Sequence, residues 1–147
     1  PALKELITKS GKDANAPRPL AEHNPTSVGL SIRVATVRFE AGSSSLDNED
    51  RALLQDVVGM FRQNGKSLLV IGHASSRTRD LDPIAHQLAN FNVSVDRANR
   101  VTKELTRLGI KPNQIFVGAK SDSEPIYYEV MPAGEAGNRR TEIYIDY

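Results

Sequence analysis

The 147-residue chain contains no cysteine and no tryptophan, and aromatic side chains make up only 5% of it. Without cysteine it cannot form disulfide bonds, a thiol nucleophile or a cysteine-ligated zinc site. With so few aromatic rings it lacks the stacking platforms typical of proteins that hold single-stranded nucleic acid. The formal net charge of +1 is also too small to indicate binding to nucleic acid. We therefore expect no nucleic-acid partner.

The sequence also has no apolar run approaching the roughly 18 residues of a membrane-spanning helix. Its composition is instead ordinary for a globular domain, with 39% hydrophobic and 25% charged residues. The stretch before residue 30 is rich in Pro, Asn, Gly and Ala, which favours irregular structure. We expect residues 1–29 to form an N-terminal extension or linker and residues 30–147 to form one domain.

The hydrophobic pattern of residues 30–147 predicts strands and helices in the order β-α-β-α-β-β. Helical crossovers between strands favour parallel or mixed pairing, whereas the closing strand favours an antiparallel neighbour. We therefore expect a two-layer α/β (α+β) sandwich with a mixed sheet. Strands are expected at residues 30–39, 66–74, 114–119 and 138–147, and helices at residues 49–65 and in a segment that ends near residue 109.

For the first strand and the first helix, the sequence predicts which side chains face the core and where the helix begins. The strand alternates, which predicts that Arg33 shares a face with Ala35 and Phe39. The helix has Asp47 or Asn48 as its expected N-cap. Its apolar residues recur at spacings of three and four, which predicts one buried stripe. This stripe consists of Leu54, Val57, Val58 and Phe61.

The second long helix carries polar residues on the side that should be apolar. On a wheel of about 100° per residue, Asn90, Ser94 and Arg97 fall on or beside its apolar stripe. Arginine is almost never fully buried without a partner, and it cannot escape burial by losing its charge. Arg97 therefore needs an acceptor: a protein carboxylate, main-chain carbonyls or an anionic ligand. The apolar stripe itself consists of Ala98, Val101, Leu105 and Leu108.

Five segments, in order and at plausible spacing, resemble the OmpA-like C-terminal domain, the peptidoglycan-binding module of OmpA, Pal and MotB proteins. The resemblance covers roughly residues 32–147, and it implies the β-α-β-α-β-β sandwich inferred above. It rests on the five segments together. They read "VRFEAGSSSLDNEDRALLQDV", "LLVIGHAS", "NFNVSVDRANRVTKELTRLGI", "GAKSDSEP" and "NRRTEIYI".

The resemblance implies a groove that binds the diaminopimelate of the peptidoglycan peptide stem. In the family, an acidic residue after the second strand takes the ammonium group, and the arginine of an "LSxxRA" motif takes the carboxylate. Here "VSVDRA" puts that arginine at Arg97, with Ser94 opening the motif and the family asparagine at Asn90. The family's "NRR" corresponds to Arg139 and Arg140, at least one of which is expected to face the groove.

One departure from the family pattern affects this site. The usual "G-(Y/H)-T-D" reads "GHAS" here, so Ser75 stands where the acid is expected. A hydroxyl group can hydrogen-bond an ammonium but cannot neutralise it, and the difference could weaken binding roughly tenfold or more. The segment between Ser75 and Arg97 is also about seven residues longer than usual. Asp80 or Asp82, which lie in this added length, are candidate replacements for the missing charge.

Catalytic and metal sites are not favoured by the sequence. His73 and His86 are too far apart for the common histidine ligand spacings, and we read them as residues at a strand end and a helix start. Ser75 beside His73 has neither a GxSxG nor an SxxK context. We expect no enzyme activity, no metal and no cofactor.

A basic stripe on the second long helix has two possible interpretations. Arg100, Lys103 and Arg107 follow one another at helical spacing. Such a stripe can contact nucleic acid, but a solvated helix face explains it without a partner, and we favour that interpretation.

The resemblance implies a periplasmic domain that binds peptidoglycan and anchors a cell-envelope protein to the wall. We expect the parent protein to be membrane-anchored by a segment that this sequence does not include, and envelope proteins are further candidate partners. The alternative is an OmpA-like protein-interaction module that has lost peptidoglycan binding because Ser75 replaces the usual acid.

Overall fold

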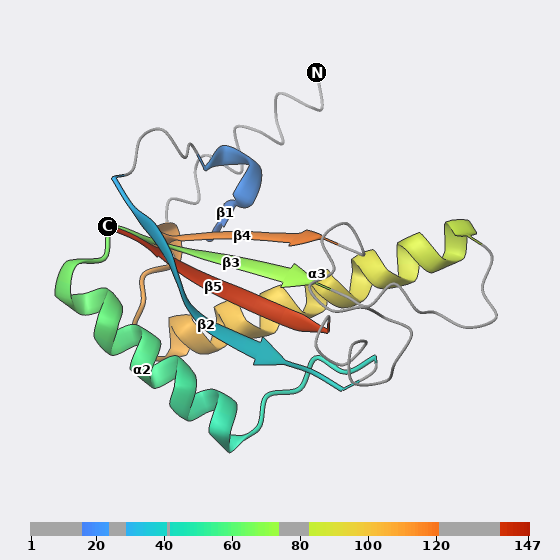
Figure 1. Ribbon diagram of the computed structural model, residues 1–147, viewed down its shortest axis with the longest axis horizontal. Helices are drawn as coiled ribbons and strands as arrows, with labels where there is room; N and C mark the ends of the chain where they lie inside the picture. Colours follow the sequence, from blue (N-terminus) through green and yellow to red (C-terminus); the bar gives the residue numbers. More distant parts are fainter. Residues whose placement is uncertain (1–15, 24–28, 41, 74–82, 121–138) are drawn as a thin grey trace.

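A five-stranded mixed sheet forms one layer of the computed structural model (Figure 1). The structure describes residues 16–23, 29–40, 42–73, 83–120 and 139–147, with the main chain alone for residues 83–91. The strands lie in the order β1-β4-β3-β5-β2. β4 runs parallel to β1 and β3, while β5 runs antiparallel to β2 and β3. The strands are β1 (Arg18–Pro19), β2 (Ser31–Arg38), β3 (Ser67–His73), β4 (Ile115–Lys120) and β5 (Arg140–Asp146).

Two α-helices share one apolar core with this sheet and form the second layer. They are α2 (Asn48–Asn64) and α3 (Pro83–Arg107), and two short 3-10 helices, η1 (Leu20–Glu22) and η3 (Pro112–Gln114), complete the described elements. α3 packs under β3, β4 and β5, and α2 packs beside β2 and α3. From β2 onward the order is the predicted β-α-β-α-β-β, so the two-layer sandwich with a mixed sheet is confirmed. No helix in the described part of the chain is long and apolar enough to cross a membrane.

The start and the buried face of α2 follow the sequence signals. Asp47 is the N-cap: its side chain accepts a hydrogen bond from the Asp50 amide, and Asp50 returns one to the Asp47 amide. This reciprocal pair satisfies two amides that the first turn of a helix leaves without partners. All four residues of the predicted stripe are buried, namely Leu54, Val57, Val58 and Phe61.

The predicted face of the first strand is wrong for Arg33. Ala35 and Phe39 point into the core as expected. Arg33, however, lies on the opposite face, where its Nη1 contacts Glu142 Oε2 at 2.9 Å. The cause is a register shift between Arg33 and Ala35 in the pairing of β2 with β5. One extra residue at such a bulge reverses the alternation on its far side.

α3 lies very close to β3 at Gly72. A Cβ atom on Gly72 would lie 2.1 Å from the Ser94 carbonyl oxygen, so only glycine fits there. The predicted apolar stripe of α3 is buried or partly buried. After the helix ends, Gly109 adopts a φ of 110°, the left-handed conformation expected of a C-cap glycine.

Part of the stretch expected to be an extension or linker lies on the sheet. β1 pairs with β4 at its edge, and Leu20 lies where a Cβ on Gly118 would be. His23 Nε2 is 2.8 Å from Asp146 Oδ2, which also accepts a hydrogen bond from Ser67. Asp146 is fully buried. Its contact with His23 attaches residues 18–23, which we call the lead-in, to β5. The division of the chain at residue 30 stays a prediction.

Candidate functional site

The candidate site lies at the edge of the sheet where β2 and β3 end and β5 begins. The chain leaves β2 through a tight turn in which the Ser43 amide donates to the Glu40 carbonyl at 3.0 Å. Gly42 has a φ of 69° in this turn, which a side chain would disfavour. The turn thereby presents two carbonyl oxygens, those of Glu40 and Ser43, toward α3.

Arg97 of α3 occupies the centre of this edge, and its side chain is only 1% exposed. Its three nitrogens donate to main-chain carbonyls: Nε to Ser43 at 2.8 Å, Nη2 to Glu40 at 3.1 Å and Nη1 to His73 at 3.3 Å. Its guanidinium carbon also lies 5.2 Å from the centre of the Phe39 ring. The sequence left three kinds of acceptor open for Arg97: a carboxylate, main-chain carbonyls or an anionic ligand. In the structure the acceptors are main-chain carbonyls. The inward direction predicted for Arg97 is confirmed.

The positive charge of Arg97 is not neutralised by a carboxylate within the described residues. Burial, followed by the repulsion of Arg139, lowers the pKa of Arg97 to about 10. The side chain therefore stays protonated at neutral pH, as a buried cation beside a second cation. Main-chain carbonyls solvate such a charge without cancelling it, so the described residues leave the charge of Arg97 uncompensated.

The two arginines of "NRR" point to different sides of the sheet. Arg139 is half-buried and donates from Nε to the Phe39 carbonyl at 3.2 Å, which places it near Arg97. Arg140 is only 2% exposed, and its Nε lies 3.4 Å from Glu142 Oε2 on the sheet face away from the helices. The sequence did not decide which of the two arginines faces the groove. In the structure, Arg139 is the one that lies beside Arg97.

The other predicted site residues are less fully described. Ser94 has no solvent exposure and lies where α3 presses against Gly72. Asn90 lies in α3, but its side chain is outside the described residues. Ser75, Asp80 and Asp82 also lie outside the described residues. Their proposed roles stay predictions.

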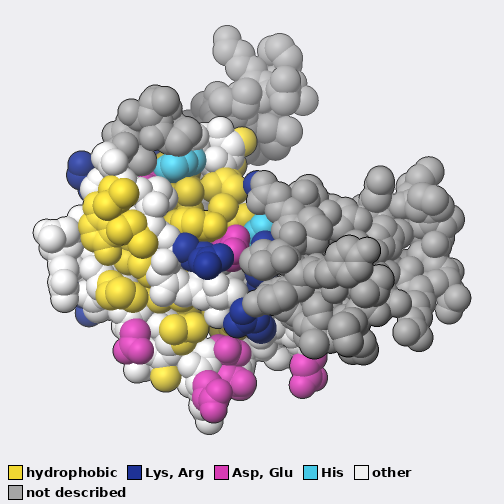
Figure 2. Space-filling view, viewed as in Figure 1, with side chains coloured by type: hydrophobic (Ala, Val, Ile, Leu, Met, Phe, Trp, Pro, Cys, Tyr) yellow, Lys and Arg dark blue, Asp and Glu magenta, His cyan; other side chains and the backbone are white. Residues whose placement is uncertain are grey.

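A second polar group, not predicted from the sequence, surrounds Glu142 on the sheet face opposite α2 and α3. Its carboxylate contacts Arg33, His73 Nε2 at 3.1 Å and the Tyr144 hydroxyl at 3.2 Å, besides Arg140. Figure 2 shows basic, acidic and histidine side chains together over the central strands. Burial raises the pKa of Glu142, but the hydrogen bond from Arg33 and the charges of Arg140 and His73 outweigh it and lower the pKa.

Comparison with known proteins now identifies the fold and its family. The OmpA family profile matches residues 38–139, which is more than half of the chain. The chain belongs to the OmpA family. Outer membrane protein A of Bordetella avium is 32% identical over 108 residues, which are 73% of this chain and 52% of that protein. The chain thus spans about half the length of this relative.

Solved structures of OmpA-like domains agree with this assignment. The cell wall anchor of the T6SS from Pseudomonas aeruginosa is 28% identical with a TM-score of 0.62, over 76% of this chain and 78% of that one. The peptidoglycan-associated lipoprotein from Burkholderia pseudomallei is 22% identical with a TM-score of 0.64, over 75% and 88%. At this lower identity the second likeness shows the fold alone. The resemblance predicted from the five segments is confirmed.

Membership in the OmpA family also places the chain among non-catalytic domains, as expected from the sequence. The matched residues include Arg97 and Arg139 but end just before Arg140. Within the described part of the chain, no group of three His, Asp or Glu side chains is arranged to hold a metal ion. His73, one of the two histidines weighed as ligands, contacts Glu142 instead.

Proposed function

We propose that this OmpA-like domain binds the peptide stem of peptidoglycan without cleaving it and so tethers a cell-envelope protein to the wall. The similarity to a cell wall anchor at 28% identity supports this function. The fold shared with a peptidoglycan-associated lipoprotein is consistent with it. The domain would act in the periplasm, where the wall lies, and the parent protein would be anchored in a membrane outside this sequence.

The observation that carries the proposal is the buried, protonated guanidinium of Arg97 beside Arg139. A guanidinium has five N–H donors, and Arg97 uses three of them on main-chain carbonyls. One N–H on each terminal nitrogen is left, and a carboxylate is the acceptor that such a pair fits best. A stem carboxylate bound there would neutralise a charge that the described residues leave uncompensated, with Arg139 adding a second attraction.

Access to this site requires a local rearrangement. Arg97 is 1% exposed and Ser94 is fully buried, so a ligand reaches either only when the groups that cover them move. The three carbonyl bonds hold the guanidinium in one orientation meanwhile, which lowers the entropy lost on binding. In this account Arg97 binds the carboxylate, while Asn90 and Ser94 add neutral hydrogen bonds.

The ammonium group of a diaminopimelate ligand needs a separate partner. Ser75 occupies the family's acidic position and supplies only a hydroxyl, so we propose that Asp80 or Asp82 supplies the negative charge. Binding of a diaminopimelate-containing peptide to Asp80→Asn and Asp82→Asn tests this by calorimetry. We expect at least one variant to bind about tenfold more weakly. Unchanged affinity in both would exclude the replacement.

Nuclear magnetic resonance locates the site directly. The isotope-labelled domain is titrated with a diaminopimelate-containing stem peptide and, as a control, with the same peptide carrying lysine in place of diaminopimelate. We expect amide shifts around Ser43, His73, Arg97 and Arg139, larger for the diaminopimelate peptide because only it carries the additional carboxylate. Shifts confined to other parts of the domain would contradict the site.

The second candidate is a protein-interaction module that has kept the fold and lost the wall ligand. The observation that favours it is that Arg97 is shielded and already bound to three carbonyls, as a purely structural residue would be. Co-purification with an envelope partner, together with no sedimentation on insoluble peptidoglycan, would select this alternative.

A further inference from the structure

A charged groove lies between α2 and α3. It has a volume of about 170 Å³. Its lining on α3 runs from Arg100, three residues after Arg97, to Arg107, which lies about 15 Å from Arg97 along the helix axis. Arg97 itself does not line the groove, so a ligand bound there would be held by other residues. Its lining consists of Leu46, Arg51, Arg100, Lys103, Glu104 and Arg107.

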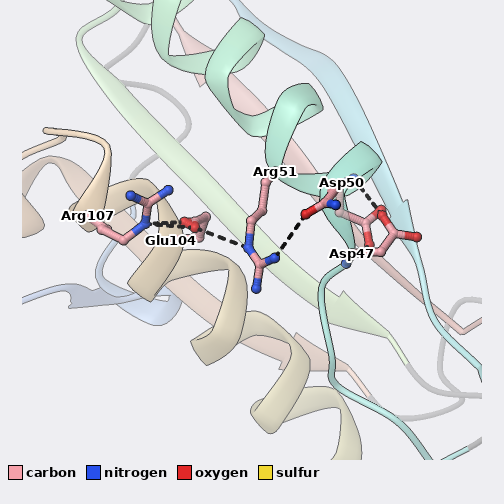
Figure 3. A network of polar contacts seen from close by, with 6 residues as sticks. Asp47, Asp50, Arg51, Glu104 and Arg107 are labelled. Carbon is pink, nitrogen blue, oxygen red and sulfur yellow. Dashed lines mark hydrogen bonds and ion pairs between the residues drawn. The ribbon is translucent and has the colours of Figure 1, made fainter.

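Glu104 is the buried carboxylate of this groove, and it contacts two of the arginines that line it. It is 7% exposed, and its two carboxylate oxygens accept from Arg107 Nε at 2.7 and 2.9 Å. Arg51 of α2 approaches from the other side, with Nε 3.7 Å from Glu104 Oε1 (Figure 3). The hydrogen bond from Arg107 is the main cause that lowers the pKa of Glu104. The ionised carboxylate thus attracts two arginines from different helices, Arg107 at 2.7 Å and Arg51 at 3.7 Å.

The groove carries more positive charge than this carboxylate neutralises. Four cations face one carboxylate, which leaves an excess of three positive charges. Arg100 and Lys103 contact no carboxylate within the described part of the chain. Arg107 engages Glu104 through Nε alone, and Arg51 uses Nη1 only for a 3.5 Å contact with Asn48. Several N–H donors are therefore available to a ligand.

We propose that this groove binds a phosphate group. Phosphate carries up to two negative charges and accepts paired hydrogen bonds from guanidinium groups, and lysine binds it as a point charge. A singly charged carboxylate would leave more of the excess charge uncompensated. Lys103 also lines a second hollow of about 410 Å³, together with Thr102 and Thr106. The basic stripe seen in the sequence is then part of a binding site.

The test is a nuclear magnetic resonance titration of the domain with sodium phosphate and with glycerol phosphate at constant ionic strength. We expect saturable amide shifts around Arg51, Lys103 and Arg107, and affinity about tenfold weaker in the double variant Arg100→Gln/Lys103→Gln. The matched control is Lys66→Gln/Lys111→Gln, which removes the same charge from exposed positions outside the groove. It should bind like wild type.

Two further arms distinguish the source of the phosphate. Flotation with phosphatidylcholine vesicles that contain or lack phosphatidylglycerol shows whether a lipid headgroup is bound. Binding that requires phosphatidylglycerol and the groove cations would identify a membrane-borne phosphate, and a response to glycerol phosphate alone would identify a soluble ester. No saturable shift with any probe, or equal loss of affinity in the two double variants, would overturn the proposal. Peptidoglycan binding through Arg97 is independent of either result.

Discussion

The Arg97 guanidinium lies 2.8 Å from the Ser43 carbonyl oxygen, to which its Nε donates a hydrogen bond, although the two residues are 54 positions apart. This bond joins α3 to the turn that follows β2. The same guanidinium holds the Glu40 and His73 carbonyls, so one side chain connects the ends of two strands to a helix. Any role in ligand binding is thus built on a structural one.

Arg97→Ala should destabilise the domain by about 3 kcal/mol, because buried carbonyls that lose their donor each cost about 1–3 kcal/mol and removal of a desolvated charge offsets part of this. Arg97→Lys should recover only part of the loss, since an ammonium cannot span the carbonyls of Glu40, Ser43 and His73 as a planar guanidinium does. Urea unfolding monitored by circular dichroism measures both. Wild-type stability in Arg97→Ala would show that these bonds contribute nothing.

Gly72→Ala should destabilise the domain by about 3 kcal/mol, because the new methyl group would overlap the Ser94 carbonyl oxygen and push α3 away from β3. The matched control is Gly59→Ala on the exposed side of α2, where a Cβ meets nothing within 4 Å. That change should stabilise the domain by about 0.5–1 kcal/mol through helix propensity. Thermal unfolding of the two variants should therefore shift in opposite directions, and equal shifts would contradict the close approach.

Glu142 should contribute stability that depends on pH. Its pKa in the folded domain is below the ordinary value of 4.5. A lowered carboxyl pKa stabilises the folded state above pH 4.5, and this contribution disappears as the pH falls through the folded pKa. The difference in unfolding free energy between wild type and Glu142→Gln should therefore shrink in acid. A difference that stays constant from neutral to acidic pH would exclude the ion-pair account.

His23→Ala should loosen the lead-in from the sheet. The variant loses the contact with Asp146 and the edge-on packing of the His23 ring against Phe116. We expect faster amide hydrogen exchange in β1 and at the β4 edge, measured by mass spectrometry, with little change in α2. Glu22→Gln is the control, since its exposed pair with Arg18 should contribute almost nothing. Unchanged hydrogen exchange in His23→Ala would mean that the contacts of His23 do not hold the lead-in against the sheet.

The sequence predicts the features of this fold that are local or periodic. Capping chemistry limits the N-cap of α2 to Asp47 or Asn48, because a capping side chain bonds an amide only two or three residues away, and the structure shows Asp47. Apolar spacing identifies the buried face of α2 and the inward direction of Arg97, because both depend only on the helical period. The order of strands and helices follows from the same patterns.

Features that depend on contacts between distant segments were not predicted. The bulge that turns Arg33 away from the core comes from the register between β2 and β5, which no local pattern encodes. The acceptors of Arg97 are main-chain carbonyls, and these carry no residue-type signature. The sequence does contain a signal for the polar group around Glu142. Glu142 precedes the core residue Ile143 in the same strand, so its side chain must face the other side of the sheet.

The measurement that tests the central claim most directly is cosedimentation of the domain with insoluble peptidoglycan. Wild type is compared with Arg97→Ala and with Leu105→Ala, a core variant expected to lose about 2–5 kcal/mol without touching the site. Circular dichroism must first show that both variants are folded. The account predicts that wild type and Leu105→Ala sediment with the wall and that Arg97→Ala stays in solution. Equal retention of Arg97→Ala and wild type would contradict it.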